Sequence, residues 1–206
     1  MASAEADATR AAFPIFARAV GIDPDSIKWL NVDPALRENL LARGDVDAIP
    51  GMEIDKLTLM ERGVKPEDIT TFRFSDYGVN LYGHVLLASN KMIAEKPEVV
   101  AAFLRAMNDA IVASIAHPET AVKAVHVFDP LTDPRTDLEK LKIQLQVIDT
   151  PFARQHGLGD IDKAAVARQI DLASDIFRLK TKPTVDQIFD LSFPPPKAER
   201  IPPAHA

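Results

Sequence analysis

Three polar residues, Asp7, Thr9 and Arg10, stand where the sequence predicts the start of a helix. The N-terminus of a helix presents free N–H groups that bind anions, and an arginine beside it can hold a carboxylate or sulfonate through two hydrogen bonds. Asp and Thr are also residue types that cap helices, and an exposed arginine is often only solvated. The three residues therefore indicate either a ligand-binding helix start or an ordinary capped helix.

Two further polar residues, Asn31 and Glu53, follow short apolar segments that we interpret as strands, at 27–32 and 46–49. Open α/β sheets bind ligands at the carboxyl ends of their strands. Glu53 could accept hydrogen bonds from an amine or aminopyrimidine, which would disfavour a simple anion such as nitrate. Its alternative role is a favourable charge in the first turn of a helix. Asn31 could bind a ligand or hold a turn.

The segment 74–83 reads Phe-Ser-Asp-Tyr-Gly-Val-Asn-Leu-Tyr-Gly and contains both tyrosines of the chain, Tyr77 and Tyr82. We interpret it as a crossing between two parts of the fold. A tyrosine ring can stack on a ligand and also form a hydrogen bond, which suits a pocket at a hinge. Either ring could instead pack structurally, and Asn80 between them could bind a ligand or hold the turn.

Catalytic chemistry finds little support in the sequence. The chain has no cysteine, and its five histidines lack the spacing of metal ligands. No serine lies in a nucleophile elbow, and no glycine-rich phosphate loop is present. We therefore predict no catalytic residue, no metal site and no cofactor.

Composition excludes other classes of protein. The net charge is −6, and no basic stripe with interleaved aromatic residues is present, so we predict no nucleic-acid partner. No consecutive apolar run reaches the roughly 18–20 residues of a membrane span. Residues 1–7 lack the basic and apolar regions of an export signal, so the chain as written is expected in the cytoplasm.

The first third of the chain predicts an α/β layer with a mostly parallel sheet. Gly21-Ile22-Asp23-Pro24 recurs as Gly63-Val64-Lys65-Pro66, and each copy is expected to end a helix with a left-handed glycine. The expected helices are 8–20, with a break or a late start at Pro14, and 34–43, capped by Asp33. The expected strands are 27–32, 46–49 and 70–74. No strand is expected before residue 8, so the fold is expected to begin part-way through.

Beyond Gly83 the pattern becomes helical after one more expected strand, at 84–89. The longest predicted helix is 97–116, with Val100, Phe103, Leu104, Met107 and Ile111 facing inward. Further helices are predicted at 119–127, 135–147 and 162–179, with a break at 157–160. The proline-rich tail at 194–206 should wrap around the fold or hang free.

Three segments in series carry a family resemblance: Gly-Asp-Val-Asp-Ala at 44–48, the crossing at 76–83, and Pro-Glu-Val-Val-Ala-Ala-Phe-Leu-Arg-Ala at 97–106. Together they resemble the solute-binding proteins of ABC importers of the nitrate, sulfonate, taurine and pyrimidine-precursor type. The resemblance implies a periplasmic-binding-protein-like (type II) two-lobe α/β fold that closes on a small ligand, here shortened at its N-terminus. Residues 1–78 would form most of lobe two, and 79–206 the returning half of lobe one with its helices.

The resemblance implies capture of a small organic solute, such as a sulfonate, an aromatic carboxylate or a pyrimidine precursor, for an ABC permease. It also implies a periplasmic location, although no export signal is visible. The enzymatic branch of this superfamily makes the thiamin pyrimidine with a histidine and a cysteine-rich segment, and this chain has no cysteine. The main alternative is a shortened interaction or regulatory module that forms homo-oligomers through an exposed sheet edge. A cofactor-using enzyme and a fragment without independent function are the remaining alternatives.

Overall fold

The computed structural model describes residues 1–204 and divides into two compact units. Unit 1 consists of Met1–Tyr82 with Arg168–Lys182, and unit 2 consists of Gly83–Ala167 with the chain from Pro183 onward. Each unit is described by itself. The assignment of residues 1–78 and 79–206 to two lobes stays a prediction.

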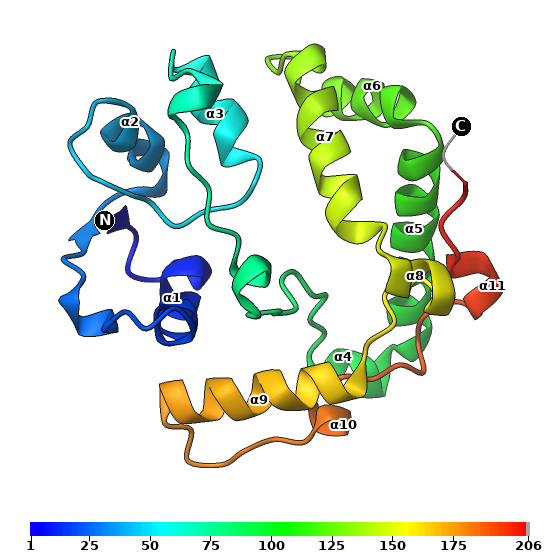
Figure 1. The fold of residues 1–206 in the computed structure, drawn as a ribbon. Helices are drawn as coiled ribbons and strands as arrows, with labels where there is room; N and C mark the ends of the chain where they lie inside the picture. The colour runs from blue at the N-terminus through cyan, green and yellow to red at the C-terminus, as the bar shows by residue number, and fades with distance from the viewer. Residues whose placement is uncertain (205–206) are drawn as a thin grey trace. The chain divides into compact units, whose positions relative to one another are not determined.

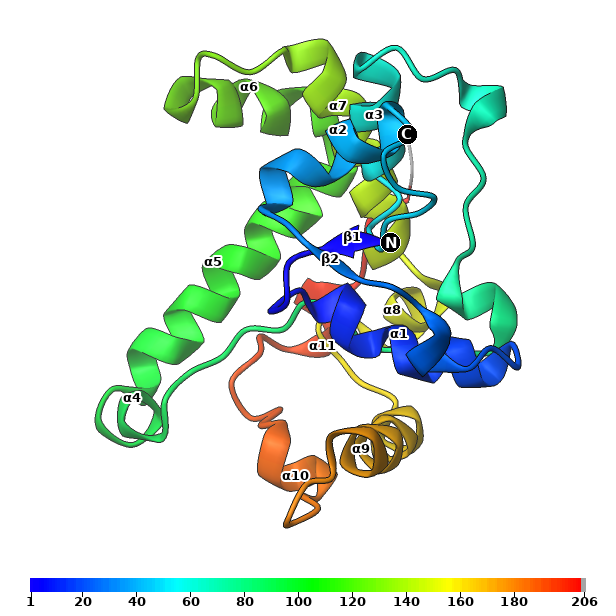
Figure 2. The same cartoon turned by 90° about the vertical axis from the view of Figure 1, so that its left-hand side faces the viewer.

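Unit 1 contains a two-stranded parallel sheet of β1 (Ala2–Ser3) and β2 (Leu30–Asn31), seen side by side in Figure 2. The expectation that no strand precedes the first helix is therefore wrong. The backbone of β1 has partners on both sides, because Leu30 donates to the Met1 carbonyl and Ala2 donates to the Ala48 carbonyl. Such pairing holds a short segment extended even where its side chains have little strand propensity.

The mostly parallel sheet that the sequence predicts is not formed by the described residues, which are mainly helical. The expected strand 27–32 shortens to β2, and the segments 46–49, 70–74 and 84–89 are not strands. A strand is defined by a ladder to a neighbour, not by apolar β-branched residues alone. The segment 46–49 makes a single backbone bond to β1, which is too little for a ladder.

The first helix, α1 (Ala8–Ala19), begins where the sequence predicts, with Asp7 as its N-cap. Neither the break nor the late start that was expected at Pro14 occurs. An interior proline costs a helix about 3 kcal/mol, and here the burial of Phe13, Phe16 and Ala17 on one face of α1 stabilises the unbroken helix.

The remaining helical elements of unit 1 are short. The predicted helix 34–43 begins as the 3₁₀ turn η2 (Pro34–Leu36), with Asp33 as its N-cap, and continues as α2 (Arg37–Ala42). The other elements are η1 (Pro24–Ser26), α3 (Asp55–Glu61), η3 (Pro66–Asp68) and η4 (Phe74–Tyr77). The glycines of the sequence repeat are left-handed, with φ of 73° at Gly21 and 87° at Gly63, which confirms their predicted role.

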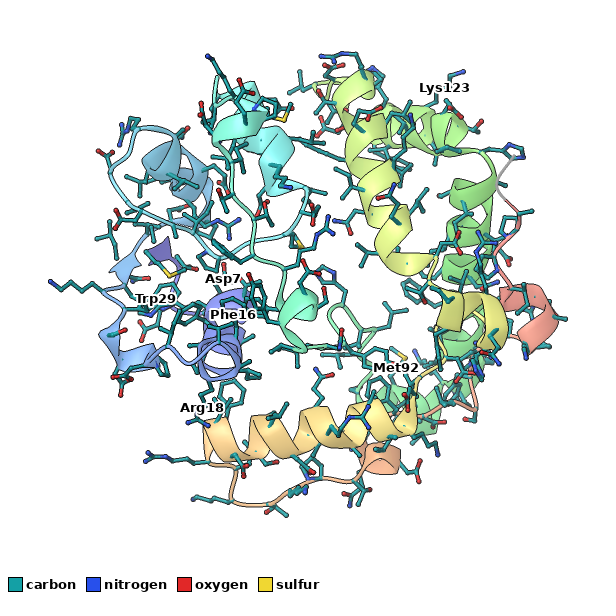
Figure 3. The ribbon with its side chains drawn as sticks, in the orientation of Figure 1. Asp7, Phe16, Arg18, Trp29, Met92 and Lys123 are labelled. Carbon is teal, nitrogen blue, oxygen red and sulfur yellow. The ribbon has the colours of Figure 1, made fainter. Side chains whose placement is uncertain are left out.

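An aromatic core holds α1 against the following segments of unit 1 (Figure 3). Phe16 stacks on Phe74 at a centroid distance of 4.6 Å, and Phe13 meets Trp29 edge-on at 5.5 Å. Offset and edge-to-face pairs add about 0.5–1.5 kcal/mol beyond the burial of their surface. Segments far apart in sequence are thereby fixed around one helix.

Unit 2 is built of helices (Figure 1). Its helices are α4 (Asn90–Glu95), α5 (Pro97–Ala116), α6 (Pro118–Phe128), α7 (Pro134–Ile148), α8 (Pro151–His156), α10 (Val185–Ile188) and α11 (Lys197–Arg200). Helix α9 (Lys163–Phe177) begins in unit 2 and continues into unit 1. The four predicted helices are confirmed to within two residues at each end, as α5, α6, α7 and α9. The short helices α4, α8, α10 and α11 were not predicted.

The core of unit 2 gathers at the C-terminal half of α5. Ile115 clusters with Leu145, Ala153 and Leu158, and the partly buried Ile111 packs against them. The predicted inward face of α5 is therefore wrong at Phe103 and Met107, which are exposed. Helical periodicity identifies an apolar face, whereas the contacts with α6, α7 and α8 decide which part of that face is covered.

Among residues 1–204, one helix, α5, is long and apolar enough to cross a membrane by length and composition. The expectation that no stretch is apolar enough for a membrane span is therefore corrected. Arg105 and Asp109 interrupt the run of apolar residues, but the mean hydropathy of the helix stays high enough to meet the criterion. A helix of a globular domain passes the same test. Within unit 2, Asn108 on α5 bonds the backbone carbonyl of Glu199 in the tail.

The proline-rich tail wraps around unit 2. Arg105 pairs with Glu199, and the guanidinium of Arg200 donates to the carbonyls of Leu158 (2.6 Å) and Pro195 (2.8 Å). The backbone N–H of Leu158 donates in return to the Arg200 carbonyl at 2.7 Å. Of the two possibilities that the sequence left open, the structure has the wrapped tail.

Replacing Gly157 with alanine is expected to destabilise unit 2 by about 1–3 kcal/mol. Gly157 has a φ of 101°, and an added Cβ would lie 3.1 Å from the Cβ of Arg200, so strain and overcrowding act together. Urea unfolding followed by circular dichroism measures the loss. Gly83→Ala is the matched control, because its added Cβ meets nothing within 4 Å. Equal losses in both variants would contradict the prediction.

Candidate functional site

Arg37, the first residue of α2, is surrounded by three carboxylates of unit 1. Its guanidinium donates to Asp7 Oδ2 at 3.2 Å, to Asp55 Oδ2 at 2.9 Å and to Glu38 Oε1 at 2.8 Å. All four side chains are at most 17% exposed. We call these four residues the Arg37 cluster. Charge-assisted bonds of this kind are among the strongest in proteins, so the cluster ties α1, α2 and α3 together.

Asp7 joins the Arg37 cluster to the start of α1. Its Oδ1 accepts from Thr9 N at 2.7 Å and from Arg10 N at 3.4 Å, and it also accepts from the Thr9 hydroxyl. Burial works to raise the pKa of Asp7, but the hydrogen bonds from Thr9 and Arg10 and the nearby hydroxyl of Ser3 hold it below its ordinary value. Asp7 therefore caps α1, as its alternative role as a helix cap predicted, whereas Thr9 lies within the helix and donates two hydrogen bonds to that cap.

The carboxylate of Asp55 is more closely surrounded by neighbouring atoms than the carboxylate of Asp7. Its Oδ2 also accepts the backbone N–H of Met52 at 2.8 Å, and a Cβ built on Gly51 would lie 2.1 Å from this oxygen. Burial raises the pKa of Asp55, Arg37 opposes the rise, and the carboxylates of Glu38 and Asp7 add to it. A side chain at residue 51 would therefore require the carboxylate of Asp55 to move away from its partners, Arg37 and the backbone of Met52.

Arg10 lies beside the cluster without joining it. Its Nη1 donates to the Ser3 carbonyl at 3.2 Å, and its guanidinium carbon lies 4.8 Å above the Trp29 ring. Figure 3 labels both Asp7 and Trp29, which belong to unit 1. Arg10 thus links β1 to the residue before β2.

The last residues of the two strands, Ser3 and Asn31, are register partners. Because the strands are parallel, both residues lie at the same carboxyl edge of the sheet, as expected for Asn31. The Asn31 side chain accepts the backbone N–H of Glu5 at 2.8 Å, so it holds the loop between β1 and α1. The structure brings Asp7, Thr9, Arg10 and Asn31 together at this edge.

Glu53 is engaged away from the Arg37 cluster. It forms a two-bond pair with Arg73, at 2.7 and 2.9 Å, and a contact of 3.2 Å with Lys56. The hydrogen bond from Arg73 lowers the pKa of Glu53 most, burial opposes it, and Lys56 lowers it further. Helix α3 begins only at Asp55, so Glu53 does not lie in its first turn. The alternative role of Glu53, a favourable charge in the first turn of a helix, is therefore wrong.

The crossing residues play different parts. The Tyr77 ring meets Phe16 edge-on at 5.3 Å and is part of the aromatic packing, although it is partly exposed. Asn80 is exposed. The backbone of Tyr82 forms two bonds with the side chain of Gln169, of 2.8 and 3.2 Å, both within unit 1. Whether these three residues bind a ligand stays a prediction.

Four residues of the site were not predicted from the sequence: Ser3, Arg37, Glu38 and Asp55. The available signals were the position of Arg37 and Glu38 in the predicted helix 34–43 and the position of Asp55 four residues after Gly51. Neither signal indicates that the side chains meet, because the contacts join residues 18 and 30 positions apart.

Other kinds of site are less well supported in the described part of the chain. No group of three or more His, Asp or Glu side chains there could hold a metal ion. Open surface hollows lie beside Leu40 and Arg62 and beside Lys163 and Phe189. None of the eight predicted site residues lines either hollow.

Comparison with protein families gives one match: the model of the family described as NMT1/THI5 like matches residues 2–121, more than half of the chain. The chain belongs to the NMT1/THI5-like family. A search of curated proteins and a search of solved structures gave no significant match. The family is one of solute-binding proteins for sulfonates, nitrate, taurine and thiamin precursors, which confirms the resemblance seen in the sequence.

Membership of the NMT1/THI5-like family implies a periplasmic-binding-protein type II fold and a small-molecule ligand. The match spans β1, β2 and the whole Arg37 cluster in unit 1, and α5 in unit 2. The family is one of binding proteins, although THI5-type members can be enzymatic. Membership leaves the solute itself open.

Proposed function

We propose that this chain is the solute-binding component of an ABC importer and that it captures a small organic solute. The observation that carries the proposal is the set of polar side chains at the carboxyl edge of β1 and β2, inside the segment that matches the family. Open α/β sheets bind their ligands at this edge. The Arg37 cluster fixes the surrounding helices and so prepares the edge for binding.

The proposed mechanism is a two-state closure around the solute. An open form without ligand and a closed form with ligand would exchange, and solute contacts made only in the closed form would favour it. Delivery to a membrane permease and a periplasmic location are parts of the same proposal, and they rest on family membership.

A solute panel tests the proposal. Thermal unfolding and the fluorescence of the single tryptophan, Trp29, would be followed with a sulfonate (taurine), an aromatic carboxylate (benzoate) and a pyrimidine (4-aminopyrimidine). A solute that binds the folded chain at 100 times its Kd stabilises it by about 2.7 kcal/mol. We expect at least one class to raise the Tm and change the fluorescence. If no class does either, the proposal fails.

A second candidate function is an interaction module that pairs with itself. It is favoured by β2, whose one ladder partner among residues 1–204 is β1 and which carries an exposed Leu30. An open strand edge is a template for pairing with another chain. A mass that rises with concentration, without any response to the solute panel, would favour this function over transport.

A further inference from the structure

The Arg37 cluster carries more negative than positive charge. One guanidinium faces the three carboxylates of Asp7, Glu38 and Asp55, and Glu38 is only 6% exposed. Counting Arg10 still leaves three carboxylates against two guanidinium groups. Partly buried charge without a partner is costly, so a further positive group at this place would be stabilised.

The donors that could hold an anion are largely used. The backbone N–H groups of Thr9 and Arg10 at the start of α1 both donate to Asp7. The donors of Arg37 are divided among its three carboxylates, and Arg10 is held by the Ser3 carbonyl and the Trp29 ring. An incoming sulfonate or carboxylate would have to displace a carboxylate of the protein itself.

The hydroxyl of Ser3 points independently to a missing ligand group. Ser3 is fully buried at the end of β1, and its Oγ has no hydrogen-bond partner. It lies near enough to Asp7 to lower the pKa of that carboxyl. Leaving a buried hydroxyl unsatisfied is unfavourable, because the group has lost its hydrogen bonds to water without replacing them. A ligand N–H group at this edge would satisfy Ser3 Oγ and the carboxylates together.

From this geometry we infer that the carboxyl edge of β1 and β2 takes the cationic group of the solute, an amidinium, guanidinium or protonated amine, and rejects anions. The inference rests on the proposed solute-binding function and selects one chemical class among its solutes. A metal ion does not fit, because the carboxylates surround the guanidinium of Arg37 and no metal-holding group is found among residues 1–204.

Three probes of nearly equal shape test the inference: benzamidine, benzamide and benzoate, which are a cation, a neutral molecule and an anion. Binding to the full chain would be measured by calorimetry and by the fluorescence of Trp29, which lies against Arg10 at this edge. One charge-assisted hydrogen bond corresponds to about tenfold in affinity or more. We expect benzamidine to bind at least about tenfold more tightly than benzamide or benzoate.

The substitution Asp55→Asn keeps the shape of the side chain and removes one negative charge of the cluster. It should weaken benzamidine binding by about tenfold, because the charge-assisted component is lost. Asp25→Asn is the control, because Asp25 is an exposed residue of η1 outside the cluster, and it should leave binding unchanged. Glu38→Gln gives the same test if the Asp55 variant fails to fold.

The outcomes separate this inference from the proposed function. A preference for benzoate, or equal binding of the three probes, would overturn the inference and leave solute binding standing. Failure of all three probes would also overturn it, and the solute panel would then decide the function. Equal weakening by Asp55→Asn and Asp25→Asn would overturn the assignment to the Arg37 cluster.

Discussion

Replacing Arg37 with methionine is expected to lower the free energy of unfolding of unit 1 by about 3–5 kcal/mol. The substitution leaves the carboxylates of Asp7, Glu38 and Asp55 close together without their shared counter-charge. Methionine keeps most of the length and apolar volume of the side chain, so the loss reports the charge. Urea unfolding followed by Trp29 fluorescence measures it.

The loss in Arg37→Met should shrink as the pH falls. In the natural chain the pKa of Asp7 is lowered by folding, so its contribution to stability is present above its ordinary pKa and declines as the pH drops through the folded value. Without Arg37 the neighbouring carboxylates repel one another at neutral pH, and protonation at low pH relieves that repulsion. Unfolding at pH about 7 and about 4 compares the two regimes.

Arg43→Met is the matched control for Arg37→Met. Arg43 pairs with Asp45 at 2.7 Å, but the two side chains are 67% and 48% exposed. Surface pairs of this kind contribute about 0–1 kcal/mol. A loss in Arg43→Met as large as in Arg37→Met, or a loss in Arg37→Met that does not change with pH, would contradict the role given to the cluster.

Phe16→Ala is expected to destabilise unit 1 by a similar amount, about 3–5 kcal/mol. Phe16 is 8% exposed, stacks on Phe74 at 4.6 Å and supports the edge of Tyr77 at 5.3 Å. Truncation removes both aromatic pairs and leaves a cavity on the buried face of α1. Urea unfolding gives the loss in free energy.

Phe72→Ala separates this effect from a general loss of aromatic surface. Phe72 is 61% exposed and meets Tyr77 only at a centroid distance of 6.5 Å. Its truncation should change the stability by less than about 1 kcal/mol. If both phenylalanine variants lose the same stability, the packing of Phe16 is not the support of α1 that we describe.

Features decided by neighbouring residues could be predicted from the sequence. The Asp7 cap, the left-handed Gly21 and Gly63, and the four long helices follow from local propensity and helical periodicity. Three short segments in series also identified the family, which the match over residues 2–121 confirms. These features depend on contacts within a few residues or on the order of motifs along the chain.

Only the tertiary structure decided the sheet and the site. The strand β1 exists because residues 28–32 and Ala48 supply partners for its backbone, and no pattern in Met-Ala-Ser indicates this. Likewise, Arg37 meets Asp7 and Asp55 across 30 and 18 positions of the chain. A hydrogen bond or ion pair depends on positions in space, and a single sequence does not state which distant residues the packing of α1, α2 and α3 brings to hydrogen-bonding distance.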